Sequence, residues 1–348
     1  MILTDEFLMQ RCFQLAELGE GKVAPNPKVG ALLVYENQII AEGYHQEYGK
    51  AHAEVNCIDS CPQYLSHLIS LSTLYVSLEP CSHHGKTGPC SHLIIEKGIK
   101  KVVVGSRDFN PLVNGNGIAY LKENGVEVVE LHWDQKQKEL NPQFYINQLY
   151  NRPLIIAKFA QSADGFMSKE NERVKITPSS VDVLSHKLRS QVDAILIGKN
   201  TYRIDKPLLN VRLVEGKNPD RIVLDSHIEN DYDSWASDFQ KTLIINQKFD
   251  FVHQSLNYVL VPNMFDINEV LNNLFSLGYF SILVEGGCQV IQSFLDKNLV
   301  DNLIVYTNQT LIMTKGIISP KWDDSKFKVI SQQDIESIEI NKYIACNT

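Results

Sequence analysis

The sequence has no long hydrophobic run and no basic residues ahead of an apolar segment at its start. A membrane-spanning helix needs about 18 or more consecutive apolar residues, and no segment approaches that length. Residues 1–6 lack the positive charge with which a secretory signal peptide begins. We therefore expect a cytoplasmic protein that has no membrane partner.

An excess of positive charge is also missing. The 348 residues include 33 Lys and Arg against 41 Asp and Glu, a formal net charge of -8 at pH 7. Proteins that bind nucleic acids neutralise phosphates with a basic surface, so this composition argues against a nucleic-acid partner. The length and the 44% of hydrophobic residues are typical of a globular protein with two domains.

Cysteine is present, but its positions form no disulfide framework. The count of 7 is odd, and the cysteines at positions 12, 57, 61, 288 and 346 are scattered. Cys57 and Cys61 are four residues apart and could form a second metal pair on a helix face. We interpret them instead as core or free thiols, because buried reduced cysteine packs as a small hydrophobic residue.

The stretch from His52 to Cys90 has the residue types of a catalytic zinc site. His52, Cys81 and Cys90 supply three ligands that suit tetrahedral Zn²⁺ and leave a fourth position open for water. Each cysteine follows a proline, as is common where a helix begins, and the positive end of a helix favours thiolate. A closed structural site, or a buried His beside unrelated cysteines, is the alternative, and the missing fourth ligand disfavours the closed site.

Glu54, two residues after His52, indicates what the open position is for. A carboxylate here can take a proton from water and pass it to a leaving amine, as in zinc nucleobase deaminases with an H-x-E motif and a later P-C. Side chains two positions apart diverge within a helix, so we place His52 at a helix start, from which Glu54 reaches back. The pattern predicts a zinc-dependent deaminase.

Strand-like and helix-like segments alternate along the chain. In the first half we expect a helix capped by Thr4 and ended by residues 19–21, strands over 31–35, 39–43, 73–77, 101–105 and 126–130, and helices over 91–97 and 117–124. In the second half we expect strands over 154–158, 193–198, 221–225 and 281–285, and helices over 179–190, 267–277 and 287–296. This alternation predicts α/β sheets covered by helices on both sides. The polar segment 131–152 is interpreted as a short helix plus linker.

Polar residues follow several of the predicted strands. If the second sheet is parallel, one crevice would be lined by Lys158, Asp164, Arg189, Thr201, Asp205, Arg212 and Glu285. Arg189 and Arg212 suit an anionic substrate, with surface salt bridges as the alternative. Gly286-Gly287 after a strand would let backbone N–H groups hydrogen-bond a phosphate, although a plain strand–helix turn has the same pattern. In the first half, prolines on both sides of Asn26 would hold its side-chain amide in place to hydrogen-bond the edge of a base. The alternative is that the Asn26 side chain only hydrogen-bonds the backbone of its own turn.

Taken together, these residues resemble the bifunctional deaminase/reductase family of riboflavin biosynthesis. The matching motifs are Asn26-Pro27 with Val29-Gly30, His52-Ala53-Glu54, and the segment from Glu79-Pro80-Cys81 to Pro89-Cys90. Eight residues separate the two cysteines, whereas nucleic-acid and free-nucleoside deaminases usually have two. The resemblance covers nearly the whole chain. It implies a cytidine-deaminase-like α/β/α domain over residues 1–145 and a dihydrofolate-reductase-like α/β domain over residues 151–348.

The resemblance also implies a function for each domain. The first would remove an amino group from a 2,5-diamino-6-(phosphoribosylamino)pyrimidinone with Zn²⁺, and the second would reduce the ribosyl chain with NADPH to give 5-amino-6-(5-phosphoribitylamino)uracil. The deaminase substrate positions are Asn26, His45, His84 and Lys86, and the reductase substrate positions are Asp164, Arg189, Leu209, Arg212 and Glu285. The dinucleotide positions are Gln161, Thr201, Asp205, Ser226, Gly286 and Gly287. Glu54 matches the proton shuttle, and Lys158 is expected near the hydride-transfer centre or as a phosphate clamp.

The chain departs from the family in three places. It has Asp108-Phe109-Asn110-Pro111 for Asp-Pro-Asn-Pro, Gly88 for the first Pro of Pro-Pro-Cys, and Arg-Val-Lys-Ile-Thr-Pro over 173–178 for Ser-x-Trp-Ile-Thr-Gly. Lys175 or Arg173 is expected to contact a cofactor phosphate in place of the lost groups. Two alternatives therefore stay open: an active deaminase with a degenerate reductase-like domain, and a non-catalytic, metal-stabilised binding or regulatory protein. In each case we expect a homo-oligomer, either a dimer or a tetramer.

Overall fold

The computed structural model describes residues 3–82, 88–110, 113–170 and 174–346. The chain divides into two compact units, Met1–Tyr150 and Asn151–Thr348. Within the described residues, no helix combines the length and the apolar character needed to cross a membrane.

The first unit contains a sheet of five strands in the order β2-β1-β3-β4-β5. Their bounds are Gly30–Tyr35 for β1, Gln38–Tyr44 for β2, Thr73–Leu78 for β3, Lys101–Ser106 for β4 and Glu127–Glu130 for β5. β1 runs antiparallel to β2 and β3, whereas β3, β4 and β5 are parallel. The carboxyl ends of β3 and β4 therefore lie together, so the segments that follow Leu78 and Ser106 become neighbours.

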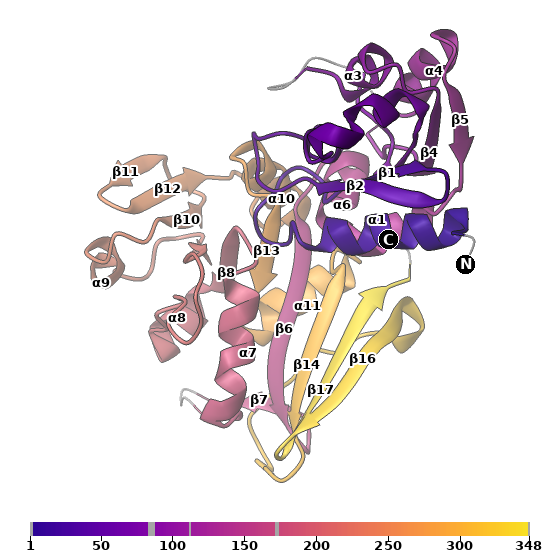
Figure 1. Ribbon diagram of the computed structural model, residues 1–348. Helices are drawn as coiled ribbons and strands as arrows, with labels where there is room; N and C mark the ends of the chain where they lie inside the picture. The colour runs from indigo at the N-terminus through magenta and orange to yellow at the C-terminus, as the bar shows by residue number, and fades with distance from the viewer. Residues whose placement is uncertain (1–2, 83–87, 111–112, 171–173, 347–348) are drawn as a thin grey trace. The chain divides into compact units, whose positions relative to one another are not determined.

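Helices cover both faces of this sheet (Figure 1). They are α1 (Asp5–Glu17), α2 (Ala53–Asp59), α3 (Cys90–Glu96), α4 (Asn116–Glu123), α5 (Asp134–Leu140) and α6 (Pro142–Tyr150), with a 3-10 segment η1 at Gln63–Leu71. Successive strand residues point to opposite faces, so Leu32 packs in the cluster of α1 while Leu33 packs with α2, α3 and α4. The Thr4 side chain accepts a hydrogen bond from the backbone N–H of Phe7 and caps α1.

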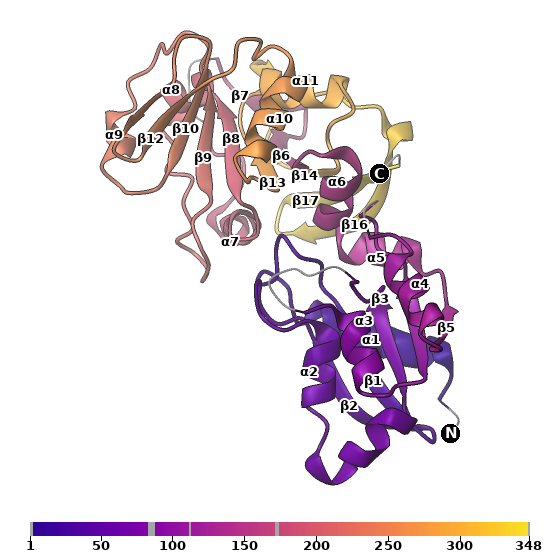
Figure 2. The ribbon, with the colours of Figure 1, turned by 90° about the horizontal axis from the view of Figure 1, so that it is seen from above.

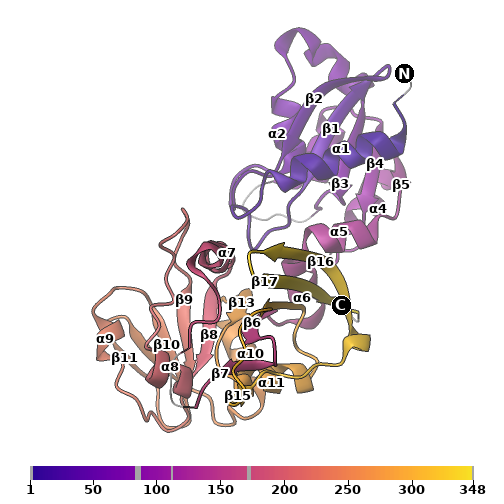
Figure 3. The same ribbon diagram turned by 90° about the horizontal axis from the view of Figure 1, so that it is seen from below.

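The second unit is built on a sheet in the order β11-β12-β10-β9-β8-β13-β6-β14-β17-β16. The strands are β6 (Leu154–Ser162), β8 (Ala194–Gly198), β9 (Asp220–Leu224), β10 (Thr242–Asn246), β11 (Phe251–His253), β12 (Leu256–Leu260), β13 (Ser281–Val284), β14 (Asn302–Asn308), β16 (Phe327–Ile335) and β17 (Ile338–Ala345). All pairs from β12 to β14 are parallel, and the outer pairs are antiparallel. A short pair is formed by β7 (Phe166–Ser168) and β15 (Ile317–Ile318) (Figure 3).

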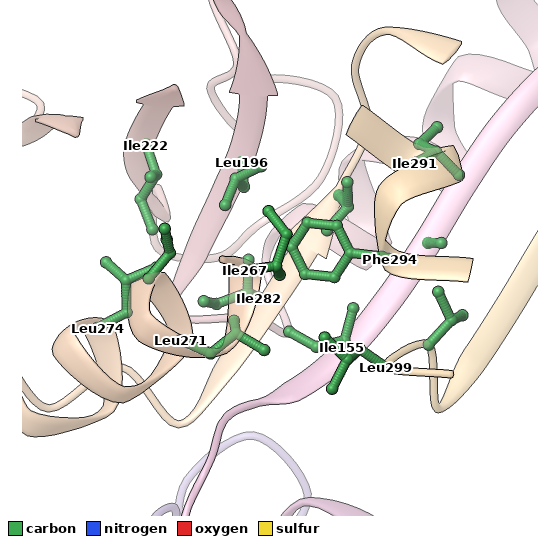
Figure 4. Close-up of a cluster of buried hydrophobic side chains, with 14 of the residues drawn as sticks. Ile155, Leu196, Ile222, Ile267, Leu271, Leu274, Ile282, Ile291, Phe294 and Leu299 are labelled. Atoms are coloured by element: carbon green, nitrogen blue, oxygen red, sulfur yellow. The ribbon is translucent and has the colours of Figure 1, made fainter. Parts of the chain in front are cut away.

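Helices also cover both faces of the second sheet (Figure 2). They are α7 (Ser179–Arg189), α8 (Lys199–Asp205), α9 (Asp233–Ala236), α10 (Ile267–Ser276) and α11 (Cys288–Asp296), with a 3-10 turn η2 at Asp324–Lys326. On one face, Leu271 of α10 and Phe294 of α11 point toward Ile155 and Ile282 of the strands (Figure 4). On the other, Val181 of α7 packs in a cluster with strand residues of β14 and β17.

The predicted α/β class is confirmed for both units, and so are the predicted helices and strands, to within a few residues at their ends. The interpretation of residues 131–152 as a short helix plus linker is wrong, because this segment forms two helices, α5 and α6. The strands β14, β16 and β17 lie beyond the last predicted element. β17 separates β16 from β14 in the sheet, and the polar composition of β16 fits its place at the edge.

Candidate functional site

The three predicted metal ligands converge in the first unit. His52 is the N-cap of α2, and Cys90 is the first residue of α3. The Nδ1 atom of His52 lies 3.6 Å from Cys81 Sγ and 3.3 Å from Cys90 Sγ, and the ligand atoms of all three residues lie within 4.8 Å of one another. In a tetrahedral zinc site, ligand atoms are roughly 3.6 Å apart, given bonds of about 2.0 to 2.3 Å. This nitrogen and sulfur donor set therefore fits Zn²⁺.

The two thiols differ in their electrostatics. The pKa of Cys81 is lowered to about 4, chiefly by the hydrogen bond from the Cys90 thiol and also by the hydrogen bond with His52. The same hydrogen bond, together with burial, raises the pKa of Cys90. The backbone N–H of Cys90 also donates to Cys81 Sγ at 3.4 Å. Cys81 is therefore held as a thiolate, which is the form that binds metals.

Glu54 lies in the first turn of α2 and is only 4% exposed. Burial raises the pKa of this carboxyl to about 7, with a smaller contribution in the same direction from Cys81. A carboxyl group with a pKa near neutrality can both accept and return a proton. The start of α2 thus places the His52 ring and the Glu54 carboxyl group in the same cavity.

Asn26 and His45 form a second polar pair in this unit. His45 Nδ1 lies 3.0 Å from the carbonyl oxygen of Ala51, and its Nε2 lies 3.3 Å from Asn26 Nδ2. Because a carbonyl only accepts, Nδ1 carries the hydrogen and Nε2 accepts from the Asn26 amide. Burial lowers the pKa of His45, which favours this neutral form. The orientation of the Asn26 amide is therefore fixed.

These groups share one cavity of about 300 Å³. Its walls include the predicted residues Asn26, His45, His52, Glu54 and Cys81. They also include residues that were not predicted as site residues, namely Tyr48, Lys50, Glu79, Asp108, Asn110, Phe144 and Gln148, although Glu79, Asp108 and Asn110 belong to motifs noted in the sequence. Phe144 and Gln148 come from α6 and share a face because they are four residues apart. That spacing was the available signal, but it lies in the segment interpreted as a linker. The predicted positions His84 and Lys86 lie outside the described residues.

The second unit has its own cavity, of about 470 Å³, at the carboxyl ends of parallel strands. It brings together the predicted residues Lys158, Lys175, Arg189, Thr201, Asp205, Arg212, Glu285 and Gly287. Gly287 has a φ of 76°, a conformation that favours glycine, and it is the N-cap of α11. At Gly286, an added Cβ would lie 2.7 Å from Ile197 Cγ2, so this glycine allows close packing of the turn.

Glu285 links two cationic side chains in this cavity. Its Oε2 accepts from Arg189 Nε at 3.1 Å and from Nη2 at 2.8 Å, and its Oε1 lies 4.0 Å from Lys158 Nζ. Lys158 Nζ also lies 4.8 Å from the centre of the Tyr306 ring. Burial lowers the pKa of Lys158, although Glu285 acts in the opposite direction. Lys158 is therefore a largely buried amine, with 14% of its side chain exposed, and releases its proton more readily than an exposed lysine.

Other predicted positions of the second unit are engaged within the protein. Gln161 Nε2 donates to Thr307 Oγ1 at 3.1 Å, and Ser226 Oγ lies 2.8 Å from His227 Nδ1. Asp164 accepts hydrogen bonds from Ser162 Oγ and from the backbone N–H groups of Met313 and Thr314. The side chain of Leu209 is buried in the core beside β9, where its backbone has a φ of 52°. None of these four residues is among the described lining residues of the cavity.

Lys175 occupies the position where the family has tryptophan. Its Nζ lies 2.8 Å from Ser179 Oγ and 3.1 Å from Asp182 Oδ2, so the side chain forms an ion pair at the cavity wall. Arg173 lies outside the described residues.

Comparison with known proteins gives a consistent family for both units. Residues 3–106 match the cytidine and deoxycytidylate deaminase zinc-binding region, and residues 153–321 match the RibD C-terminal domain. The riboflavin biosynthesis protein RibD of Actinobacillus pleuropneumoniae is 37% identical over 331 residues, which cover 91% of this chain and 87% of the relative. The protein of the same name from Aquifex aeolicus is 35% identical and covers 87% of this chain and 86% of its own length.

Solved structures agree with this comparison. A crystal structure of a diaminohydroxyphosphoribosylaminopyrimidine deaminase/5-amino-6-(5-phosphoribosylamino)uracil reductase from Thermotoga maritima has a TM-score of 0.85 and 33% identity, and covers 98% of this chain and 99% of its own. Similarity of this extent over both units does not favour a degenerate reductase or a non-catalytic binding protein. The chain therefore belongs to the RibD family of riboflavin biosynthesis and is a bifunctional enzyme, a zinc-dependent deaminase joined to an NADPH-dependent reductase.

Proposed function

We propose that His52, Cys81 and Cys90 hold the catalytic zinc ion and that Glu54 carries the proton in the hydrolytic deamination of a 2,5-diamino-6-(5-phosphoribosylamino)pyrimidinone. The observation that supports this assignment is the convergence of three ligand atoms, two of whose residues, His52 and Cys81, line one cavity together with the buried carboxyl group of Glu54. When bound, zinc would lower the pKa of a water molecule at its open position.

The residues of the cavity then have separate tasks. Glu54 takes a proton from the attacking water as oxygen bonds to the ring carbon, and it returns the proton to the amino nitrogen, which leaves as ammonia. Asn26, oriented by His45, donates to or accepts from the edge of the pyrimidine ring. His84 and Lys86 are proposed as further substrate contacts. Among the described lining residues, Lys50 is the one Lys or Arg that can meet the substrate phosphate.

Replacing a metal ligand is expected to remove zinc from the protein. Wild-type protein should contain about one zinc per chain, because the ligand set is complete for one catalytic ion. Cys81→Ser and Cys90→Ser should each lower that content, measured by elemental analysis, and should lower deamination in parallel. Cys61→Ser is the matched control, because Cys61 lies outside the ligand cluster. Full zinc content and activity in both ligand mutants would overturn the assignment.

We further propose that the second unit reduces the ribosyl chain of the substrate in this cavity, with Lys158 as the proton donor. NADPH, when bound, supplies the hydride. Reduction breaks the ring carbon–oxygen bond, so the carbon gains a hydride and the oxygen needs a proton, which Lys158 Nζ can give. Glu285 and Arg189 hold Lys158 in place at one end of the cavity.

The charge of this cavity supports two anionic ligands. Its described lining includes five cationic side chains, Lys158, Lys169, Lys175, Arg189 and Arg212, against three acidic ones, Asp182, Asp205 and Glu285. The cavity is thus locally positive in a chain whose net charge is -8. We assign the substrate to Asp164, Arg189, Leu209, Arg212 and Glu285. The dinucleotide is assigned to Gln161, Lys175, Thr201, Asp205, Ser226, Gly286 and Gly287.

The remaining proposals concern the whole chain. We propose that residues 1–145 form the deaminase domain and residues 151–348 the reductase domain, and that the enzyme works in the cytoplasm without a nucleic-acid partner. The acidic net charge supports the last point. We also propose a homo-oligomer, a dimer or a tetramer, whose mass light scattering of the purified chain should give as two or four times 39.5 kDa. A monomer at micromolar concentration would contradict this proposal.

A further inference from the structure

One buried carboxylate, that of Glu79, is surrounded by backbone N–H groups in the deaminase unit. Its Oε1 accepts from Gly117 at 2.8 Å and from Ile118 at 3.1 Å. Its Oε2 accepts from Gly115 at 2.9 Å and from Asp108 at 3.2 Å. Glu79 is only 4% exposed and lines the same cavity as Glu54.

Three carboxyl groups line this cavity, those of Glu54, Glu79 and Asp108, and the surroundings of Glu79 suit it to hold neighbouring segments in place. An ionised carboxylate has about four lone-pair sites, and the four N–H donors occupy those of Glu79. These hydrogen bonds fix the position of every segment that donates to Glu79.

One of the segments that donate to Glu79, residues 108–110, is part of the cavity wall, whereas the donors at residues 115–118 lie behind the lining. Asp108 and Asn110 line the cavity, and the Asp108 carboxylate accepts from the backbone N–H of Asn110 at 2.8 Å, which shapes the turn. Gly117, at the start of α4, packs so closely that an added Cβ would lie 1.9 Å from the carbonyl oxygen of Pro80. Glu79 thus joins the turn that leads to the ligand Cys81 with the wall formed by residues 108–110.

The opposite side of this wall is held by an aromatic contact. The ring of Phe109 meets the ring of Tyr145 edge-on, with 5.0 Å between their centres and an angle of 83°. Tyr145 belongs to α6, the helix that also contributes Phe144 and Gln148 to the cavity. Phe109 is the residue that stands where the family has proline, so an aromatic contact supplies the restraint that a proline ring would give.

We infer that Glu79 is a positioning residue of the deaminase, which holds residues 108–110 as a wall of the substrate cavity, and that Phe109 anchors the same wall to α6 from outside. This inference rests on the proposed deaminase function of the cavity. A misplaced wall changes how the substrate is seated, and an error of about 1 Å can cost about 10²-fold in kcat/KM. The zinc ligands and the reductase unit need not change.

The test compares deamination kinetics of Glu79→Gln and Phe109→Ala with wild type, together with zinc content and reductase activity of the same samples. Glutamine keeps the shape of the side chain, but its NH₂ group faces two of the N–H donors and cannot accept from them. We expect Glu79→Gln to lose about 10²-fold in kcat/KM, chiefly through a higher KM, with zinc retained. Phe109→Ala should raise KM about 2- to 10-fold. Glu123→Gln on the exposed side of α4 and Phe7→Ala on α1 are the matched controls.

Each outcome decides the question. An unchanged KM in Glu79→Gln, even with a lower melting temperature, would show a purely structural role and overturn the inference. Loss of zinc would also overturn it, because the substitution would then act through the turn that carries Cys81. If Glu79→Gln does not fold, the KM of Phe109→Ala decides alone, and an unchanged value overturns the inference. Absence of deamination in zinc-loaded wild type would instead refute the proposed function.

Discussion

Glu54→Gln is expected to lower the deamination rate by at least about 10²-fold, the low end for loss of general acid–base catalysis. Glutamine preserves the size and the hydrogen-bonding ability of the side chain, but it cannot accept and return a proton. Glu54 is buried in the cavity, and burial raises its pKa to about 7, a value that suits a group that must both accept and return a proton. The fall should therefore appear in kcat rather than in KM.

The same chain supplies the control for this experiment. Zinc content should stay at about one per chain, because Glu54 is outside the His52, Cys81 and Cys90 ligand set. Reduction of the already deaminated substrate with NADPH should be unchanged, because that cavity belongs to the other unit. Glu123→Gln should match wild type in all three measurements. Loss of both activities in Glu54→Gln would indicate misfolding, and full deamination would refute the assignment of the proton carrier.

The sequence was most informative where chemistry and local geometry coincide. Two of the three ligand residues lie at helix starts, because His52 is the N-cap of α2 and Cys90 follows Pro89 at the start of α3. The expectation that Pro80 likewise opens a helix at Cys81 is wrong, because Cys81 lies in a loop after β3. The parallel sheet of the second unit was also predictable, because strands that alternate with helices bring their carboxyl ends together. Lys158 and Glu285 lie side by side for that reason.

Residues that work through tertiary contacts could not be found in this way. Glu79 is recognisable only as part of a motif, since its four donors come from residues 108 to 118, beyond the next strand. The cavity residues of α6 were missed because the polar segment before that helix indicated a linker, whereas packing around Tyr145 stabilises a helix there. Tertiary burial also places the Leu209 side chain in a core, which no pattern in the sequence indicated.

Lys158→Met is expected to lower NADPH-dependent reduction by at least about 10²-fold, with deamination unchanged. Methionine keeps the length and the apolar stem of lysine but has no proton to give. The side chain is held between Glu285 Oε1 at 4.0 Å and the Tyr306 ring at 4.8 Å, and the cavity reaches it. Lys297→Met is the matched control, because Lys297 is an exposed lysine of the same unit that lies outside the cavity.

The pH dependence separates a proton donor from a phosphate clamp. A donor must be protonated, so the reduction rate should fall as the pH rises through the pKa of Lys158. Burial lowers that pKa from its ordinary value of 10.5, so the fall should begin at a lower pH than for an exposed lysine. In Lys158→Met the residual rate should lose this alkaline limb. If Lys158 only clamps the phosphate, kcat at saturating substrate should have no alkaline limb from Lys158 in the wild type, and the mutant should show a higher KM with kcat retained, because a clamp contributes equally to substrate and transition state.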